Sequence, residues 1–162
     1  MTRFITDEMA AAAGMELDRL VSFPIDASDV RRWALAVYHP DEPPAAFLGP
    51  APTEVPAEFN PFAWIVAEPA GGRPGYVPDS PSIEARLGLP EVETDFMLNG
   101  GTEIRYDHPM RVGDTITATT ALDGYHEREG RHGTMLFTLT TVTWTNQDDE
   151  LVKAATNTLI RY

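Results

Sequence analysis

The chain contains no cysteine among its 162 residues. Disulfide bonds, thiolate metal sites and cysteine nucleophiles are therefore excluded, and a reducing cytoplasmic location is compatible with this composition. Basic residues are also scarce, because 12 Lys and Arg stand against 25 Asp and Glu and give a formal net charge of −13. Since so acidic a chain repels polyanions, we expect neither nucleic acid nor an anionic membrane surface as a partner.

Long hydrophobic runs are missing as well. No stretch of about 18 apolar residues is present, so no membrane-spanning helix is predicted. The first residues include Asp7 and Glu8 and no apolar core, which is unlike a secretory signal peptide. The remaining composition, 43% hydrophobic and 23% charged, is typical of a globular protein. We therefore expect a single domain over residues 1–162, with no metal and no cofactor.

The first half of the chain predicts helices joined by loops. Residues 6–20 are rich in alanine and predict a short helix capped by Thr6 or Asp7, and residues 21–26 alternate like a strand. A second helix is expected to begin with Ser28 as its cap and to end before Pro40. Residues 58–67 are apolar nearly all round, which favours a buried helix.

Residues 68–90 form a different kind of segment. They hold five prolines and four glycines, a composition that predicts a long irregular insertion with at most a short helical turn around residues 83–87. Structureless stretches of this length in a compact domain tend to be functional or disordered.

The second half of the chain predicts strands. Residues 93–107, 114–129, 133–146 and 151–161 are rich in Thr, Val, Ile, Phe and Tyr and alternate in polarity. Turn-like residues separate these runs, which indicates an antiparallel meander. The order of helices followed by strands predicts an α+β fold in which a curled antiparallel sheet surrounds one central buried helix.

Three segments resemble the MaoC-like hydratase/dehydratase family, and in particular its N-terminal, FAS1-like dehydratase subgroup. Residues 101–117 (GTEIRYDHPMRVGDTIT) carry a corner in which Pro109 ends a strand, Gly113 makes the turn and Asp114 holds it. Residues 141–161 resemble the two closing strands, and residues 25–43 (IDASDVRRWALAVYHPDEP) resemble the helix that leads into the catalytic motif. The resemblance implies a single hot-dog fold.

Active members of that family carry the motif Gly-Asp-x-Asn-Pro-x-His, whose Asp and His act as an acid/base pair on a thioester-conjugated double bond. If Pro43 aligns with the proline of the motif, Pro40 stands in the place of the Asp and Ala45 in the place of the His. Neither side chain can transfer a proton. His39 and Asp41 are the only titratable pair nearby, in the wrong order and at the wrong spacing, and they are the candidate catalytic residues of a rewired site. Otherwise they are a helix-terminal histidine and a turn residue.

Two further sets of residues are candidate substrate-binding positions. Phe59, Phe62 and Trp64 either line an acyl tunnel or fill the core. Asn99, Gly100 and Gly101 interrupt a strand, which predicts a β-bulge, and in the family the corresponding region lies near the thioester pocket.

The resemblance implies three functions, which stay open at this point. The first is a subunit of an enoyl-thioester hydratase or 3-hydroxyacyl-thioester dehydratase, acting on an acyl-CoA or acyl-carrier-protein thioester. It would be the non-catalytic half of a heteromer with a second MaoC-like hot-dog subunit, and it would shape the cavity for the acyl group. The second is an active homodimer that uses His39 or Asp41. The third is a non-enzymatic protein that binds an acyl thioester or another small ligand.

Overall fold

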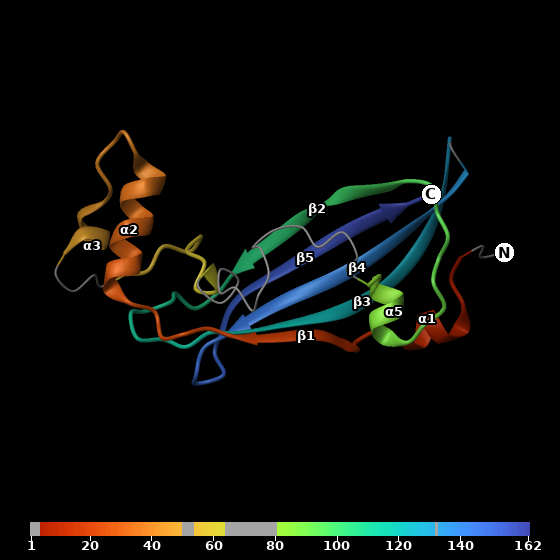
Figure 1. Cartoon of the computed structure of the whole chain (residues 1–162), viewed down its shortest axis with the longest axis horizontal. Helices are drawn as coiled ribbons and strands as arrows, with labels where there is room; N and C mark the ends of the chain where they lie inside the picture. Colours follow the sequence, from red (N-terminus) through yellow and green to blue (C-terminus); the bar gives the residue numbers. More distant parts are fainter. Residues whose placement is uncertain (1–3, 50–53, 64–80, 132) are drawn as a thin grey trace.

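The computed structural model describes residues 4–49, 54–63, 81–131 and 133–162 of the chain. One antiparallel sheet of five strands forms its body, in the order β1-β3-β4-β5-β2, and β1 and β2 are its two edges (Figure 1). This architecture confirms the predicted α+β class. The strands are β1 (Glu16–Val21), β2 (Met97–Tyr106), β3 (Thr117–Gly130), β4 (Gly133–Thr145) and β5 (Leu151–Arg161).

The four strands predicted in the second half all exist, but the prediction that they form a simple meander is wrong for β2. Strands β3, β4 and β5 do follow one another, whereas β2 pairs with β5 from Met97↔Arg161 to Tyr106↔Lys153. β1 occupies the free side of β3 instead. The residues between β2 and β3 form a wide corner rather than a tight hairpin turn, so the two strands need not be neighbours.

That corner has the structure predicted from its sequence. Gly113 adopts a φ of 97°, a left-handed conformation that glycine accepts most readily. The carboxylate of Asp114 accepts a hydrogen bond from the backbone N–H of Arg111 at 2.7 Å and another from Gln147 Nε2 at 3.1 Å. The N–H of Gly113 donates to the carbonyl of Ile25 at 2.9 Å, so the corner also holds the segment just before the helix that begins at Ala27.

The N-terminal prediction needs correction. Helix α1 (Asp7–Ala11) begins at the predicted cap, since Thr6 Oγ1 accepts from the N–H of Met9, but it ends after five residues. Gly14, at a φ of 86°, turns the chain, and β1 then pairs with β3. The helix therefore does not reach residue 20. The predicted strand over 21–26 is also wrong except at Val21, which is the last residue of β1. Pairing along β3 outweighs the local helix propensity of residues 16–20.

Two helices lie beyond one end of the sheet (Figure 1). They are α2 (Ala27–Tyr38) and α3 (Ala45–Leu48). The cap of α2 is Asp26 rather than the predicted Ser28, because the Asp26 carboxylate accepts a 2.7 Å hydrogen bond from the N–H of Ser28. Serine and aspartate are both good N-cap residues, so residue type alone does not decide between the two positions. The predicted end of α2 before Pro40 is confirmed.

A third helix, α5 (Ile83–Leu87), confirms the helical turn predicted within the irregular segment. Ser82 caps its first turn and Gly88, at a φ of 70°, ends it. The rest of the predicted insertion, residues 68–80, lies outside the described residues. The division of the chain into one domain with this insertion stays a prediction.

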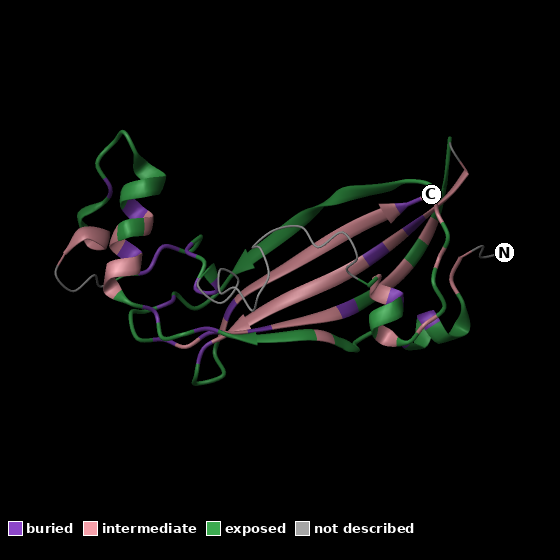
Figure 2. Ribbon diagram, viewed as in Figure 1, coloured by how far each residue is buried: buried purple, intermediate pink, exposed green. Residues whose placement is uncertain are grey.

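The two faces of the sheet differ in what covers them. Residues directly opposite each other on neighbouring strands share a face, so Trp144, Lys153 and Tyr106 lie on one face, as do Leu136 and Arg161 further along. We call this the inner face, because α5 contacts it through Glu84 and Arg161, and the loop 54–63 contacts it through Phe62 and Trp144. Within the sheet, the buried positions in Figure 2 are on β3, β4 and β5, while β2 is exposed along its whole length.

The apolar core lies at the end of the inner face that is nearest to α2, which we call the core end. Phe59 and Phe62, from the segment predicted to be a buried helix, are 6% and 5% exposed and belong to this core. Their segment forms turns at residues 57–58 and 61–62 and becomes helical only at Ala63, so the predicted helix does not begin at residue 58. Residues 64–67 lie outside the described residues. The buried members of the core cluster are Ile25, Val30, Val55, Phe59, Phe62, Met110, Ile116, Ala118 and Val152.

Candidate functional site

The segment that resembles the catalytic motif lies outside the sheet. Helix α2 ends at Tyr38, and the following His39 and Asp41 are both exposed. Asp41 is held through its backbone, whose N–H donates to the carbonyl of Tyr38 at 2.7 Å. The rings of Tyr38 and Phe47 lie 6.4 Å apart and pack α2 against α3. His39 and Asp41 are therefore near each other in the chain, but no described contact brings their side chains together.

The other described histidines do not supply a base on the inner face. His126 stacks on Phe137 with ring centroids 4.5 Å apart, and this cross-strand pair lies on the outer face. His108 is more than half exposed, with its nitrogens 3.4 Å from Asp107 and 3.7 Å from Glu150. Among residues 4–131 and 133–162, apart from the gaps at 50–53 and 64–80, no cluster of three or more His, Asp and Glu side chains has a geometry for a metal ion.

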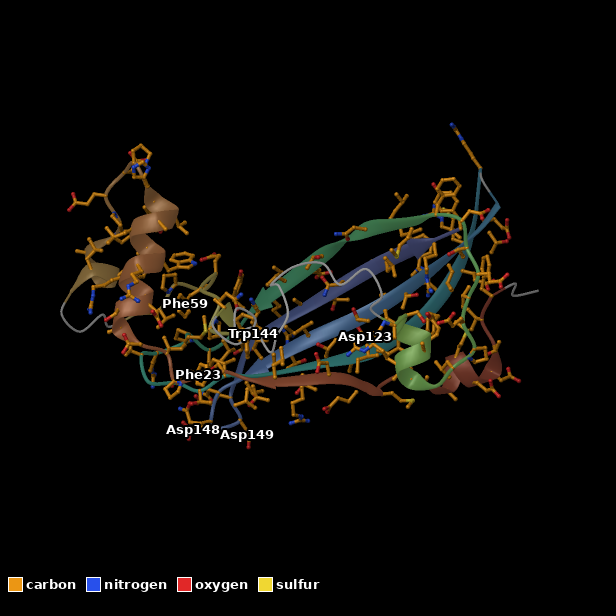
Figure 3. All side chains as sticks on the ribbon, viewed as in Figure 1. Phe23, Phe59, Asp123, Trp144, Asp148 and Asp149 are labelled. Carbon is orange, nitrogen blue, oxygen red and sulfur yellow. The ribbon has the colours of Figure 1, made fainter. Side chains whose placement is uncertain are left out.

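The predicted tunnel residues lie together at the core end. The rings of Phe62 and Trp144 meet edge to face at 5.1 Å, and Trp33 and Phe59 meet in the same way at 6.4 Å. Phe59 and Trp33 also line a largely apolar cavity of about 290 Å³ beside α2, and the other lining residues are Ala63, Asn60 and the charged Asp29 and Arg32. Figure 3 shows Phe59 on the α2 side and Trp144 at the adjacent end of β4. Phe59 is therefore a core residue that also borders a cavity, and its role in an acyl tunnel stays a prediction. Trp64 lies outside the described residues.

The predicted bulge is present, but at the other end of the sheet. The register of β2 against β5 shifts between Asn99 and Gly101, and the side chain of Asn99 accepts from the N–H of Gly101 at 2.9 Å. A Cβ on Gly100 would lie only 2.9 Å from side-chain atoms of Ile160 and Thr158. Gly100 is thus required for close strand packing. A contact of these residues with substrate stays a prediction, and within this chain they do not adjoin Phe59 and Phe62.

Sequence reasoning missed a buried polar cluster beneath α5. Glu84 is 0% exposed, and both of its oxygens accept from Arg161, at 2.7 and 3.0 Å. Arg161 also donates to Thr138 Oγ1 at 2.8 Å. Burial alone would raise the pKa of Glu84, but hydrogen bonds and the charge of Arg161 outweigh it and lower that pKa. Burial, reinforced by the negative charge of Glu84, raises the pKa of the nearby Tyr125. The cluster is a closed ion pair rather than a free acid or base.

A second missed feature is a lysine on the inner face at the core end. Lys153 is opposite Trp144 on one side and Tyr106 on the other. Its Nζ atom lies 3.4 Å from the centroid of the Trp144 ring and 6.0 Å from that of Tyr106. Burial lowers the pKa of Lys153, while the carboxylate of Glu58 acts in the opposite direction. The alternation of residues 151–161 placed position 153 on one face of a strand, but sequence alone did not indicate which face.

Within the part of the chain that the structure describes, no helix has the length and the apolar character needed to cross a membrane. An antiparallel five-stranded sheet, covered on one face by helices and a core loop, is the architecture of a hot-dog protein. The family model described as "FAS1-like, dehydratase domain region" matches residues 11–155. The chain therefore belongs to this family of MaoC-like dehydratase and hydratase hot-dog proteins.

A solved structure with a similar fold covers nearly the whole chain. The ChsH1-ChsH2 complex from Mycobacterium tuberculosis contains a chain that is 14% identical with a TM-score of 0.56, over 96% of this chain and 87% of that one. The C-terminally truncated HadBC (3R-hydroxyacyl-ACP dehydratase) complex of the same organism gives 20% identity, a TM-score of 0.48, and coverage of 91% and 98%.

The match to the Escherichia coli PaaI protein of the phenylacetic acid degradation operon is partial. It has 20% identity and a TM-score of 0.30, and it covers 41% of this chain and 42% of that one. No curated protein matches the chain significantly.

Proposed function

We propose that this chain is the non-catalytic subunit of a heteromeric enoyl-thioester hydratase or 3-hydroxyacyl-thioester dehydratase. The observation that carries the proposal is the chemistry of the motif segment. Pro40 and Ala45 stand where the family has its acid and base, and the exposed His39 and Asp41 lie beyond the end of the sheet. Hydration of a conjugated double bond needs two titratable groups within hydrogen-bond reach of one site. A second subunit would have to provide them.

The edge strand β2 supports the pairing with such a subunit. All ten of its residues are exposed, and it pairs only with β5, so one side of its backbone has no strand partner in the described structure. Its large apolar side chains are also uncovered, with Met97 68% and Ile104 47% exposed. A bare edge of this kind is a liability for aggregation unless another strand pairs with it. A similar fold over 96% of this chain comes from a complex of two named chains, which is consistent with a pairwise assembly.

In this arrangement the present chain contributes a wall of the acyl cavity. The aromatic core end, with its cavity of about 290 Å³, supplies apolar surface for an acyl group. The partner, a MaoC-like hot-dog chain with an intact Gly-Asp-x-Asn-Pro-x-His motif, supplies the acid/base pair. The thioester carrier in this proposal is CoA or an acyl carrier protein.

Co-expression with a candidate partner tests the proposal. We expect no turnover of a 2-enoyl-thioester by the lone chain, followed as loss of enoyl absorbance, and turnover by the co-purified complex. His39→Ala and Asp41→Ala in this chain should leave the rate of the complex within about twofold, because neither side chain would touch the reacting atoms. Strong turnover by the lone chain, abolished by either alanine change, would contradict the proposal in favour of a rewired homodimer.

A matched pair of edge variants tests where the partner docks. Ile104→Lys places a charge on β2, and Val21→Lys places the same charge on β1, the opposite edge, where Val21 is 53% exposed. We expect Ile104→Lys to weaken co-purification and Val21→Lys to leave it unchanged. The reverse result would move the interface to β1.

A further inference from the structure

The inner face carries a cation at the core end, Lys153. This residue is the only lysine of a chain with a net charge of −13. It lies on β5 between Trp144 of β4 and Tyr106 of β2. Only β2 separates β5 from the exposed edge, so Lys153 is both close to the core end and close to the side where a partner would pair.

The aromatic rings hold Lys153 but do not neutralise it. With Nζ 3.4 Å from the Trp144 centroid, the ammonium group lies directly over the negative face of the indole, a favourable cation–π geometry. No described carboxylate is within 4.0 Å of this nitrogen, although Glu58 is near enough to favour the charged form. An ammonium group has three N–H donors, and no hydrogen bond from a described acceptor uses them.

A half-buried cation with no carboxylate in direct contact is costly unless another group compensates it. The two cations on the inner face of β5 have different partners, because Arg161 forms an ion pair with both oxygens of Glu84 through its terminal nitrogens. At the core end the surroundings are aromatic. Trp144 leads through Phe62 into the core that also contains Phe59, and Phe59 borders the apolar cavity. This combination of aromatic surface and an ammonium group held on the Trp144 ring suits a ligand with an apolar part and an anionic group.

We propose that Lys153 binds an anionic group of the thioester ligand, either a carboxylate at the end of its acyl part or a phosphate of its carrier. The inference rests on the proposed function, because it takes a thioester as the ligand. Trp144 and Tyr106 act as positioning residues that fix the ammonium group, and Lys153 contacts the ligand. In the carboxylate case Lys153 determines specificity for acyl groups that end in a charge.

Binding of four probes to the purified chain tests the inference. Butyryl and succinyl thioesters have acyl chains of equal length and differ in a terminal carboxylate. Each is offered on CoA, which has phosphates, and on N-acetylcysteamine, which has none. Affinities are measured by titration calorimetry for the wild type and for Lys153→Met, which keeps the length of the side chain and removes its charge.

Two patterns support the inference and identify the source of the charge. If the group is a carboxylate, Lys153→Met weakens both succinyl esters by about tenfold or more and leaves both butyryl esters within about twofold. If it is a phosphate, the variant weakens both CoA esters and spares both N-acetylcysteamine esters. Lys153→Arg should retain most of the affinity. The control Arg105→Met removes a charge from the outer face of β2 and should change nothing.

Other outcomes overturn the inference. Equal weakening of all four esters by Lys153→Met would indicate a structural role, and unchanged affinities would show that Lys153 does not contact the ligand. In both cases the wild type still binds thioesters and the proposed function stands. If the wild type binds none of the four probes, both the inference and the thioester-binding role of the lone chain fail.

Discussion

Strand β5 carries two cations on the same face of the sheet, and the two are handled in opposite ways. Arg161, beneath α5, donates to both oxygens of the fully buried Glu84 and to Thr138. Lys153, eight positions earlier in the strand, lies on the ring of Trp144 and has no carboxylate of the described residues within 4.0 Å. One end of the inner face thus holds a buried ion pair, and the other holds an ammonium group on an aromatic ring.

The difference separates a structural cation from a candidate binding cation. Guanidinium matches a carboxylate in a bidentate, directional way, which suits a permanent internal link. That link joins α5 to β5 across 77 residues of sequence. An ammonium held by an aromatic ring keeps its N–H donors for another partner. A substitution that breaks the Arg161 ion pair should therefore act mainly on stability. A substitution of Lys153 should act mainly on ligand binding.

The largest effect on stability is expected from breaking the ion pair. Glu84→Gln leaves the guanidinium of Arg161 buried without its counter-charge, and we expect a loss of about 3–5 kcal/mol in the free energy of unfolding. Urea denaturation monitored by circular dichroism measures it. The exposed pair of Arg19 and Glu16 is the matched control, since Glu16→Gln should change little. Equal, small effects of the two substitutions would show that the buried pair is not a structural link.

The same ion pair should make stability depend on pH. Because the pKa of Glu84 is lowered in the folded chain, folding favours its ionised form. Its contribution is present above the unfolded pKa, near 4.5, and is lost as the pH falls through the lower folded value. The double variant Glu84→Met/Arg161→Met removes both charges, and its stability should fall less steeply below about pH 4.5. Thermal unfolding between pH 3 and pH 7 measures the slopes, and parallel curves would contradict the expectation.

How far the sequence predicts this structure depends on whether the signal is local. The strands of the second half follow from alternation and β-branched residues, and the bulge at Asn99 follows from the adjacent glycines. The place of β2 beyond β5 does not, because no local pattern states which edge a strand will join. In the same way, residues 16–20 have helical propensity and form β1 only because β3 offers them an edge.

The candidate site shows the same limit. The prediction that Pro40 and Ala45 replace an acid/base pair could be made directly, since it concerns residue types at the spacing that the resemblance implies. The pairing of Glu84 with Arg161, and the stacking of Lys153 on Trp144, could not. Each depends on strand register, which decides whether a charged residue in an alternating strand faces solvent or the covered face. Once that register is known, Lys153 and Arg161 are both placed on the inner face, because alternate residues along β5 share a face.

The smallest effect on stability is expected at the second cation, and it is the sharper test of the comparison. Lys153→Met removes a cation–π contact worth about 0.5–2 kcal/mol. It also removes the cost of holding an ammonium group half out of water, the same burial that lowers the pKa of Lys153. The two changes oppose each other, so we expect the free energy of unfolding to change by no more than about 1 kcal/mol. Urea denaturation beside Glu84→Gln provides the comparison. A loss as large as that of Glu84→Gln would mean that Lys153 is as much a part of the internal framework as Arg161. A near-neutral result leaves its charge free for a ligand.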